Sequence, residues 1–282
     1  MAKILLSAFV DEYSKDIDNQ IGLCRQQGLS YIEPRFIGNK NIVDLSVAET
    51  KELKEKLGDI KVSSIGSPLG KINLADDFNA HLEKAKRTFE IANILDAKNV
   101  RMFSFYLHEG KSHKACRGEV LDKLGQMIDL AKKFNVTLCH ENEAEIYGES
   151  PDMCLDILDA FHGDLKCVFD MGNFVLGGFN PYTEAYPKLK HYIQYFHIKD
   201  ALAAGAVVPP GCGEGHIKEI LDSYVNDFNK DVIITLEPHL QTFDGLNALV
   251  GRSFDNPYKY ETQEAAFLDA LKRIRDVISG LI

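Results

Sequence analysis

The sequence predicts an α/β protein, a single-domain (β/α)8 barrel (TIM barrel) that spans residues 1–282. Three observations lead to this prediction. Apolar, strand-like segments alternate with amphipathic, helix-like segments eight times along the chain. This alternation is typical of parallel strands joined by crossover helices, and eight pairs in 282 residues match the usual size of such a barrel. No linker, low-complexity tract or short repeat divides the chain.

The predicted strands are short runs rich in Ile, Val, Leu and Phe, whereas the predicted helices show apolar residues at helical spacing. The strands comprise residues 3–9, 30–36, 60–67, 99–106, 136–142, 165–173, 193–200 and 231–239. The helices comprise residues 16–28, 46–58, 78–96, 119–135, 150–163, 181–192, 215–227 and 263–278. We therefore expect each strand to lie parallel to its neighbours in a ring.

Several predicted helices carry recognisable signals at their ends. Ser46 and Glu49 have the spacing of a capping box, in which each side chain bonds the backbone N–H of the other residue. Ser150 precedes Pro151, a pair typical of an N-cap followed by the first helical residue. Pro187 predicts a break in the helix after the sixth strand, because proline lacks the backbone donor that a helix needs.

Composition and charge narrow the class of function. The chain has 32 Lys and Arg against 42 Asp and Glu residues, a net charge of −10. This charge repels phosphate backbones, so we expect no nucleic-acid partner. No apolar run reaches the roughly 18 residues of a membrane span, and the first residues lack a signal-peptide pattern, so we expect no membrane partner. The six scattered cysteines form no C-x-x-C pair, which favours a reduced, cytoplasmic setting.

Charged and polar side chains gather at the ends of the predicted strands, where a barrel of this type places its site. From the second, fifth, sixth, seventh and eighth strands, these are Glu33 and Arg35; His140, Glu141, Asn142 and Glu143; Asp170 and Asn173; His197, Lys199 and Asp200; and Glu237 and His239. Alternate residues of a strand face opposite sides. Inward-facing side chains of Glu141, Asp170, His197 and Glu237 would therefore surround one point.

Three carboxylates at one point repel each other strongly unless a cation lies between them. Together with the imidazole of His197, they form a ligand set suited to one divalent metal ion, Mn²⁺, Mg²⁺, Co²⁺ or Zn²⁺. Each residue also has a plainer interpretation: a strand-end glutamate can be solvated, Asp170 can cap a helix, and His197 can be a core histidine. Because the four residues lie on four consecutive strand ends, we favour the metal site and interpret Asp170 as a ligand rather than a cap.

The sequence resembles the xylose isomerase-like barrel superfamily in four segments: CHENE (139–143), FDMGN (169–173), YFHIKDA (195–201) and TLEPH (235–239). This group contains sugar and sugar phosphate isomerases and epimerases, together with endonuclease IV-type enzymes. The resemblance implies a single divalent metal held by Glu141, Asp170, His197 and Glu237. It also implies that Glu141 and Glu237 are catalytic and move a proton next to a substrate carbonyl through an enediolate.

The resemblance further implies a small-molecule partner, a sugar or a sugar phosphate. Two features depart from the 3-epimerase pattern: Asn173 stands where a histidine is usual, and no arginine follows His197 within residues 197–207. Lys199 or Asp200 is a candidate replacement for that arginine. The residues expected to bind substrate are Glu33, Arg35, Asn173, Lys199, Asp200 and His239. For Glu33 and Arg35 a surface ion pair is the alternative.

Other positions give weaker indications. Lys71 is a candidate for binding a substrate phosphate, with an ordinary exposed lysine as the alternative. Phe36, Phe105 and Phe254 are candidates for an apolar wall beside a sugar ring, with core packing as the alternative for the first two. The segment 247–263 is long for a loop in this fold, and long loops of this kind are often lids.

Other functions fit the same barrel. A dehydratase or lyase acting on keto-sugars or keto-inositols would begin with the same proton removal. A DNA-repair endonuclease would need three zinc ions and further histidines, which Asn173 and the segment 211–218 do not supply. A non-catalytic sugar-binding barrel would be expected to lack a ligand, and all four are present. The sequence leaves open whether the chain forms a homo-oligomer.

Overall fold

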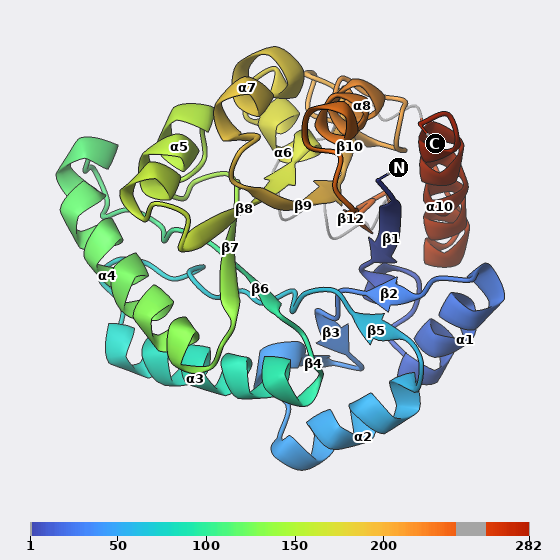
Figure 1. Ribbon diagram of the computed structural model, residues 1–282, viewed down its shortest axis with the longest axis horizontal. Helices are drawn as coiled ribbons and strands as arrows, with labels where there is room; N and C mark the ends of the chain where they lie inside the picture. The colour runs from blue at the N-terminus through green and yellow to red at the C-terminus, as the bar shows by residue number, and fades with distance from the viewer. Residues whose placement is uncertain (1, 241–257, 282) are drawn as a thin grey trace.

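The computed structural model describes residues 2–240 and 258–281 and confirms the predicted barrel, with a ring of strands surrounded by helices (Figure 1). Six strands form one parallel sheet in the order β1-β12-β9-β8-β7-β6, and β2 pairs in parallel with β5. Their bounds are β1 (Ile4–Ala8), β2 (Tyr31–Ile32), β5 (Lys61–Val62), β6 (Asn99–Met102), β7 (Thr137–Glu141), β8 (Leu165–Asp170), β9 (Ile193–Ile198) and β12 (Val232–Leu236).

Backbone hydrogen bonds close the ring on both sides of the short pair β2–β5. The Glu33 N–H donates to the Ala8 carbonyl at 3.0 Å, which joins the end of β2 to β1. On the other side, the Ile65 N–H donates to the Asn99 carbonyl and the Arg101 N–H donates to the Ile65 carbonyl, each at 3.0 Å. The barrel is therefore continuous although two of its strands are only two residues long.

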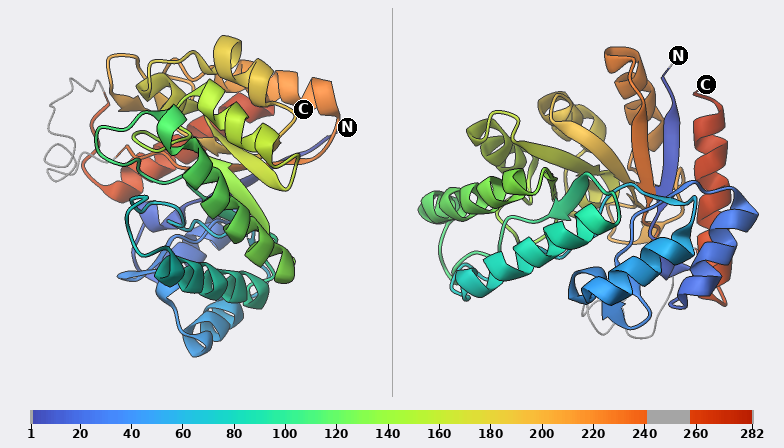
Figure 2. Two further views of the ribbon diagram at one scale, coloured as in Figure 1. Left: turned by 90° about the vertical axis from the view of Figure 1, so that its left-hand side faces the viewer. Right: turned by 60° about the horizontal axis from the view of Figure 1, so that its bottom comes forward.

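The helices lie outside the ring, and α10 lies alongside β12 and α8 (Figure 2). Their bounds are α1 (Ile17–Gln27), α2 (Val47–Leu57), α3 (Phe78–Ile94), α4 (His113–Lys133), α5 (Pro151–Ala160), α6 (Met171–Leu176), α7 (Tyr186–Leu189), α8 (Ile217–Phe228) and α10 (Gln263–Ser279). Short turns are η1 (Val10–Glu12), η2 (Ile42–Asp44) and the π-helical η3 (Pro181–Ala185). Two antiparallel pairs, β3 (Phe36–Ile37) with β4 (Lys40–Asn41) and β10 (Asp200–Ala201) with β11 (Val207–Val208), complete the fold.

The predicted helix starts are confirmed where a cap was recognised. Ser46 and Glu49 form the reciprocal capping box at α2, and Ser150 caps α5 with Pro151 in its first turn. The helix expected from residue 119 begins earlier, at His113, because the Ser112 side chain caps it. The expected irregularity near Pro187 is present, since η3 gives way to α7 directly before this residue.

All eight predicted strands are shorter in the structure than in the sequence analysis, and three of them illustrate the reasons. The strand expected to reach residue 173 ends at Asp170, because α6 begins at the next residue. The strands expected over 30–36 and 60–67 form a regular ladder over two residues each. Beyond the ladder the Ser63 hydroxyl also donates to the Ile32 carbonyl at 3.0 Å, and Pro34 has no N–H to offer.

Within the part of the chain described, no helix combines the length and apolar character needed to cross a membrane. All six cysteines are free thiols, five of them buried. Inside the barrel, Cys139, Val168 and Tyr195 form a small buried layer. Each of these residues lies two positions before a predicted metal ligand of the same strand, so the strand alternation directs those ligands to the interior as well.

His81, on α3, fixes the loop that follows β5. Its Nε2 accepts a hydrogen bond from the Gly70 N–H at 2.9 Å. Gly70 has φ of +86°, and a Cβ there would lie 1.9 Å from the Phe103 carbonyl oxygen, so only glycine fits. Burial, together with the charge of Lys84, lowers the pKa of His81 to about 4. The neutral ring is therefore part of the folded structure.

We expect this histidine to make the fold sensitive to acid. Its folded-state pKa of about 4 lies below the unfolded value near 6.5, so its contribution is present above pH ~6.5 and is lost as the pH falls toward 4. The loss is on the order of 3 kcal/mol in unfolding free energy. His81→Gln keeps an acceptor that does not titrate. Urea unfolding at pH 7.5 and 4.5 should show a larger loss for the wild type than for this variant; equal losses would contradict the assignment.

Candidate metal and substrate site

The four predicted ligands come together at the C-terminal end of the barrel. Glu141 ends β7, Asp170 ends β8, His197 lies on β9, and Glu237 follows β12. The register pairs Asp170 directly with His197, and the Glu237 N–H donates to the Ile198 carbonyl at 3.1 Å. Each of the four residues is at most 2% exposed. One ligand atom from each lies within 4.8 Å of the others, so the strand ends form one compact donor cluster.

A buried carboxylate behind His197 fixes the direction of its ring. The His197 Nε2 lies 3.2 Å from Oε2 of Glu33, and Nδ1 lies 2.8 Å from Oε1 of Glu141. The Tyr195 hydroxyl and the Thr235 hydroxyl donate to Glu33 at 2.9 and 2.8 Å. Glu33 is fully buried. This arrangement, in which a carboxylate holds the far nitrogen of an imidazole, is typical of metal-binding histidines and leaves Nδ1 facing the cluster.

Cationic side chains balance much of the buried negative charge. Arg101 Nη1 lies 3.1 Å from Oε2 of Glu141. Lys199 Nζ lies 3.0 Å from Oδ2 of Asp170 and 3.3 Å from Oε2 of Glu237. Burial raises the pKa of Glu141, but the charges of His197 and Arg101 outweigh it and hold the value at about 2. Burial is likewise outweighed at Glu237, where Lys199 and two histidines hold the pKa well below its usual range.

Asp170 differs from the two glutamates in its balance of charge. Burial raises its pKa to about 7, and the nearby charge of Lys199 only partly opposes this. A further positive charge is needed to keep this carboxylate fully ionised at neutral pH. Three oxygen donors and one imidazole nitrogen, all buried within 4.8 Å, suit a divalent cation. The residues present therefore fit a single divalent metal ion held by Glu141, Asp170, His197 and Glu237.

The structure corrects the choice between capping and metal binding at Asp170, because one oxygen serves as a cap and the other faces the cluster. Oδ1 accepts the Asn173 N–H at 2.8 Å and caps α6, while Oδ2 points toward Lys199. The Asn142 side chain makes two hydrogen bonds to the backbone of Asp170. Its Nδ2 donates to the Asp170 carbonyl and its Oδ1 accepts from the Asp170 N–H, each at 3.0 Å. Capping thus orients the carboxylate that the cluster uses.

A cavity of about 200 Å³ opens beside the donor cluster. Of the four candidate ligands, Glu141 and Glu237 border this cavity, whereas Asp170 and His197 do not line it. The remaining lining is a mixture of cations, carboxylates, rings and small residues: Arg35, Phe36, Asn41, Gly66, Pro68, Lys71, Arg101, Phe103, Glu143 and His239. A bound molecule would therefore contact the two glutamates first.

The six residues expected to bind substrate separate into two groups. Arg35 and His239 border the cavity. Glu33 lies behind His197, and the Lys199 ammonium donates to Oδ1 of Asn173 at 3.1 Å behind Asp170.

Asp200 also lies away from the cavity. It accepts the backbone N–H groups of Gly211, Gly213 and Gly215, each at 2.9 Å, and thereby organises the loop after β11. The geometry therefore supports a role for Asp200 in positioning this loop rather than in binding substrate.

The aromatic predictions also separate. Phe36 borders the cavity, and Phe105 is fully buried in the core. Phe254 and residues 247–257 of the expected lid lie outside the described residues. Phe103, which the sequence analysis did not single out, lines the cavity instead.

Arg101 is a second residue that the sequence analysis missed. It lies within β6, is 6% exposed, and contacts Glu141. The signal was present in the sequence, because an arginine inside a buried strand requires a buried partner.

Arg35, which lines the cavity, forms ion pairs with three carboxylates. Its guanidinium lies 2.9 Å from Asp11, 3.2 Å from Glu12 and 3.1 Å from Glu237. Glu12, Glu237 and His239 form a second group of donor atoms within 4.8 Å. Because Arg35 already contacts all three residues of that group, its guanidinium supplies the positive charge there. The group formed by Glu141, Asp170, His197 and Glu237 is therefore the better candidate for a divalent ion.

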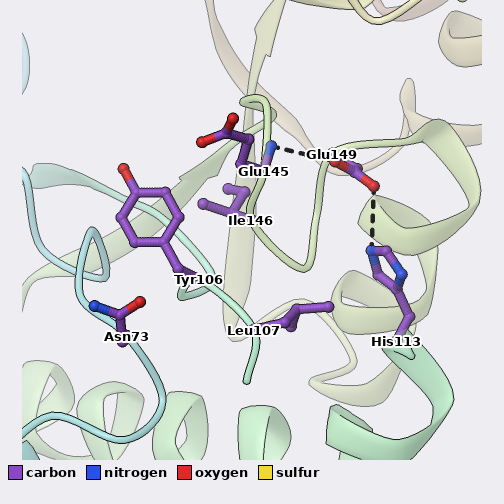
Figure 3. Close-up of a pocket in the computed structure, with 7 residues that line it drawn as sticks. All are labelled: Asn73, Tyr106, Leu107, His113, Glu145, Ile146 and Glu149. Atoms are coloured by element: carbon purple, nitrogen blue, oxygen red, sulfur yellow. Dashed lines mark hydrogen bonds and ion pairs between the residues drawn. The ribbon is translucent and has the colours of Figure 1, made fainter. Parts of the chain in front are cut away.

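A second, larger cavity of about 480 Å³ lies among the loops that follow β5, β6 and β7 (Figure 3). The side chains of Tyr106, Leu107 and Ile146 form its apolar part. The carboxylates of Glu145 and Glu149 form its polar part together with Asn73, and the His113 Nε2 lies 3.4 Å from Glu149 (Figure 3). This cavity adds acidic groups to the same face of the barrel.

We expect the contact between Glu33 and His197 to support metal affinity. Glu33→Gln removes the charge that holds the imidazole and should weaken Mn²⁺ binding by ~10–100-fold. His197→Ala removes a ligand and should cost more. Isothermal titration calorimetry on the metal-stripped proteins measures both, with circular dichroism to check the fold. An unchanged affinity in folded Glu33→Gln would show that this carboxylate has no such role.

Solved structures of other proteins share this fold. The IolI protein with a bound zinc atom matches with a TM-score of 0.74 and 19% identity, over 98% of this chain and 99% of that chain. A D-tagatose 3-epimerase-like protein matches with a TM-score of 0.73 and 16% identity, over 98% of this chain and 97% of that chain. The probable 3-DHS dehydratase AsbF from Bacillus anthracis matches with a TM-score of 0.66 and 19% identity, over 84% of this chain and 92% of that chain.

At these identities the likeness shows the fold alone. No curated protein sequence matches this chain. The family model described as xylose isomerase-like TIM barrel matches residues 21–271. The chain therefore belongs to the xylose isomerase-like TIM barrel family.

Proposed function

We propose that the protein is a divalent-metal-dependent sugar isomerase or epimerase that moves a proton next to a carbonyl group. One observation carries the proposal: of the four buried candidate ligands, the two glutamates border the cavity. Glu141 and Glu237 come from strands separated in the sheet by β8 and β9, so they reach a bound molecule from different sides. Two carboxylates placed in this way suit removal and return of a proton on one carbon.

Different side chains have different roles in the proposed reaction. Glu141 and Glu237 are held ionised by the cations around them, so either carboxylate can accept the proton from a carbon next to a carbonyl. Arg35 and His239 border the cavity and are placed to donate hydrogen bonds to substrate hydroxyls. A divalent ion held by Glu141, Asp170, His197 and Glu237 would stabilise the negative charge that develops on the substrate oxygens.

The names of matched structures are consistent with this chemistry without choosing among its variants. One is called an epimerase-like protein and another a probable dehydratase. A dehydratase also begins by removing a proton next to a carbonyl, but then expels water from the neighbouring carbon. Asn173, the departure from the 3-epimerase pattern, forms its side-chain hydrogen bonds with Lys199 and Asn142 and not with either glutamate. Isomerisation or epimerisation is therefore our main proposal, and dehydration is the alternative.

Turnover in D₂O tests the proposal. Proton transfer through a carboxylate allows exchange with solvent, so deuterium should appear on the substrate carbon next to the carbonyl. Glu237→Gln should lower this exchange by at least ~10²-fold, the lower end for losing a general acid–base group. A panel of ketoses and keto-inositols followed by proton NMR provides the readout, with metal content measured for each protein.

The outcomes separate the variants of the proposal. Deuterated product of unchanged composition supports an isomerase or epimerase, and loss of water supports a dehydratase. Product without deuterium on carbon would contradict proton transfer through the glutamates. Full exchange in metal-loaded Glu237→Gln would remove this residue from the catalytic pair.

A further inference from the structure

The cationic side chains that line the cavity beside the donor cluster are already paired with carboxylates of the protein. Arg101 contacts Glu141 at 3.1 Å, and Arg35 contacts Asp11 at 2.9 Å. Lys71 Nζ lies 2.9 Å from Oε2 of Glu143. A phosphate group in this cavity would have to compete with these carboxylates for every one of the three cations.

The charges deeper in the site are balanced as well once a divalent ion is present. A divalent ion and the ammonium of Lys199 would together carry three positive charges, which would balance the three negative charges of Glu141, Asp170 and Glu237. The Arg101 guanidinium is occupied as well, since it donates to Glu141 at 3.1 Å and to the Gly66 carbonyl at 3.3 Å. The cluster therefore has no surplus positive charge to offer a phosphate, whose burial without a counter-charge is costly.

Lys71 is the most exposed of the three lining cations, and its ammonium is paired with Glu143. Their side chains are 33% and 28% exposed, whereas Arg101 is nearly buried. The Lys71 ammonium also lies 4.3 Å from the centre of the Phe103 ring, which fixes its position on the cavity wall. The Glu143 carboxylate therefore places a negative charge in contact with the ammonium that an anion would have to bind.

Among the described residues, the loops around the second cavity do not supply a replacement cation. The cavity around Tyr106 carries Glu145 and Glu149, and its imidazole, His113, already faces Glu149 (Figure 3). These acidic groups follow Glu143 on the same loop. The potential on this side of the site therefore disfavours anions.

We infer that the site takes a neutral polyhydroxylated ligand, and that Glu143 is a specificity-determining residue that excludes phosphate and other anionic groups from Lys71. The inference rests on the proposed function only for the place where the ligand lies. It selects the unphosphorylated sugar between the two substrate classes that the sequence left open.

Binding of inorganic phosphate to the Mg²⁺-loaded full chain tests the inference, measured by isothermal titration calorimetry at low ionic strength. Glu143→Gln is the matched variant, because glutamine retains the Oε1 acceptor that bonds the Ala144 N–H at 3.0 Å. Removing a like charge at contact distance should tighten phosphate binding by about tenfold or more. The double variant Lys71→Met with Glu143→Gln should lose that gain.

Three results would overturn the inference. Wild-type protein that binds phosphate and loses this binding in Lys71→Met would show that Lys71 is available. An unchanged affinity in Glu143→Gln would remove the role of Glu143, and a gain that persists in the double variant would place the anion elsewhere. Because the readout is anion binding and not turnover, each result stands apart from the test of the proposed proton transfer.

Discussion

Four carboxylates, those of Glu33, Glu141, Asp170 and Glu237, lie buried at one end of the barrel, and the site depends on compensating their charge. Buried charges without partners are strongly destabilising. The strand ends meet this requirement with arginine, lysine and imidazole groups at 2.8 to 3.3 Å from carboxylate oxygens. A divalent ion would complete the compensation at Asp170, whose pKa burial raises to about 7. On the proposed metal site, binding of the ion would also stabilise this end of the barrel.

The backbone makes room for these side chains where a larger residue would block them. A Cβ on Gly172 would lie 2.7 Å from Cγ of Lys199, so glycine lets the lysine pack beneath α6 and reach Asp170. A Cβ on Gly213 would lie 2.3 Å from Oδ1 of Asp200, whose carboxylate gathers the N–H groups of the following loop. Gly172 and Gly213 do not contact the cavity themselves, but they leave the space that Lys199 and Asp200 need to take up their positions.

Periodicity in the sequence was sufficient to predict the eightfold alternation and to bring Glu141, Asp170, His197 and Glu237 to one end of the barrel, because alternation along a strand determines which face a side chain takes. Periodicity could not predict how deeply a polar side chain is buried in the barrel. Glu33 has the charge and the strand-end location expected of a substrate contact, but its position behind His197 depends on Tyr195 and Thr235 from other strands. Arg101 was overlooked because its partner, Glu141, lies on the adjacent strand forty residues later. The short pairing of β2 with β5 likewise depends on contacts between distant segments.

The most direct test of the metal assignment is anomalous X-ray diffraction from crystals of the protein grown with Mn²⁺. The account predicts one strong peak per chain, coordinated by Glu141, Asp170, Nδ1 of His197 and Glu237. A peak between Glu12, Glu237 and His239 with Arg35 displaced would contradict the assignment. Well-ordered crystals without a peak at the four strand ends would contradict it as well.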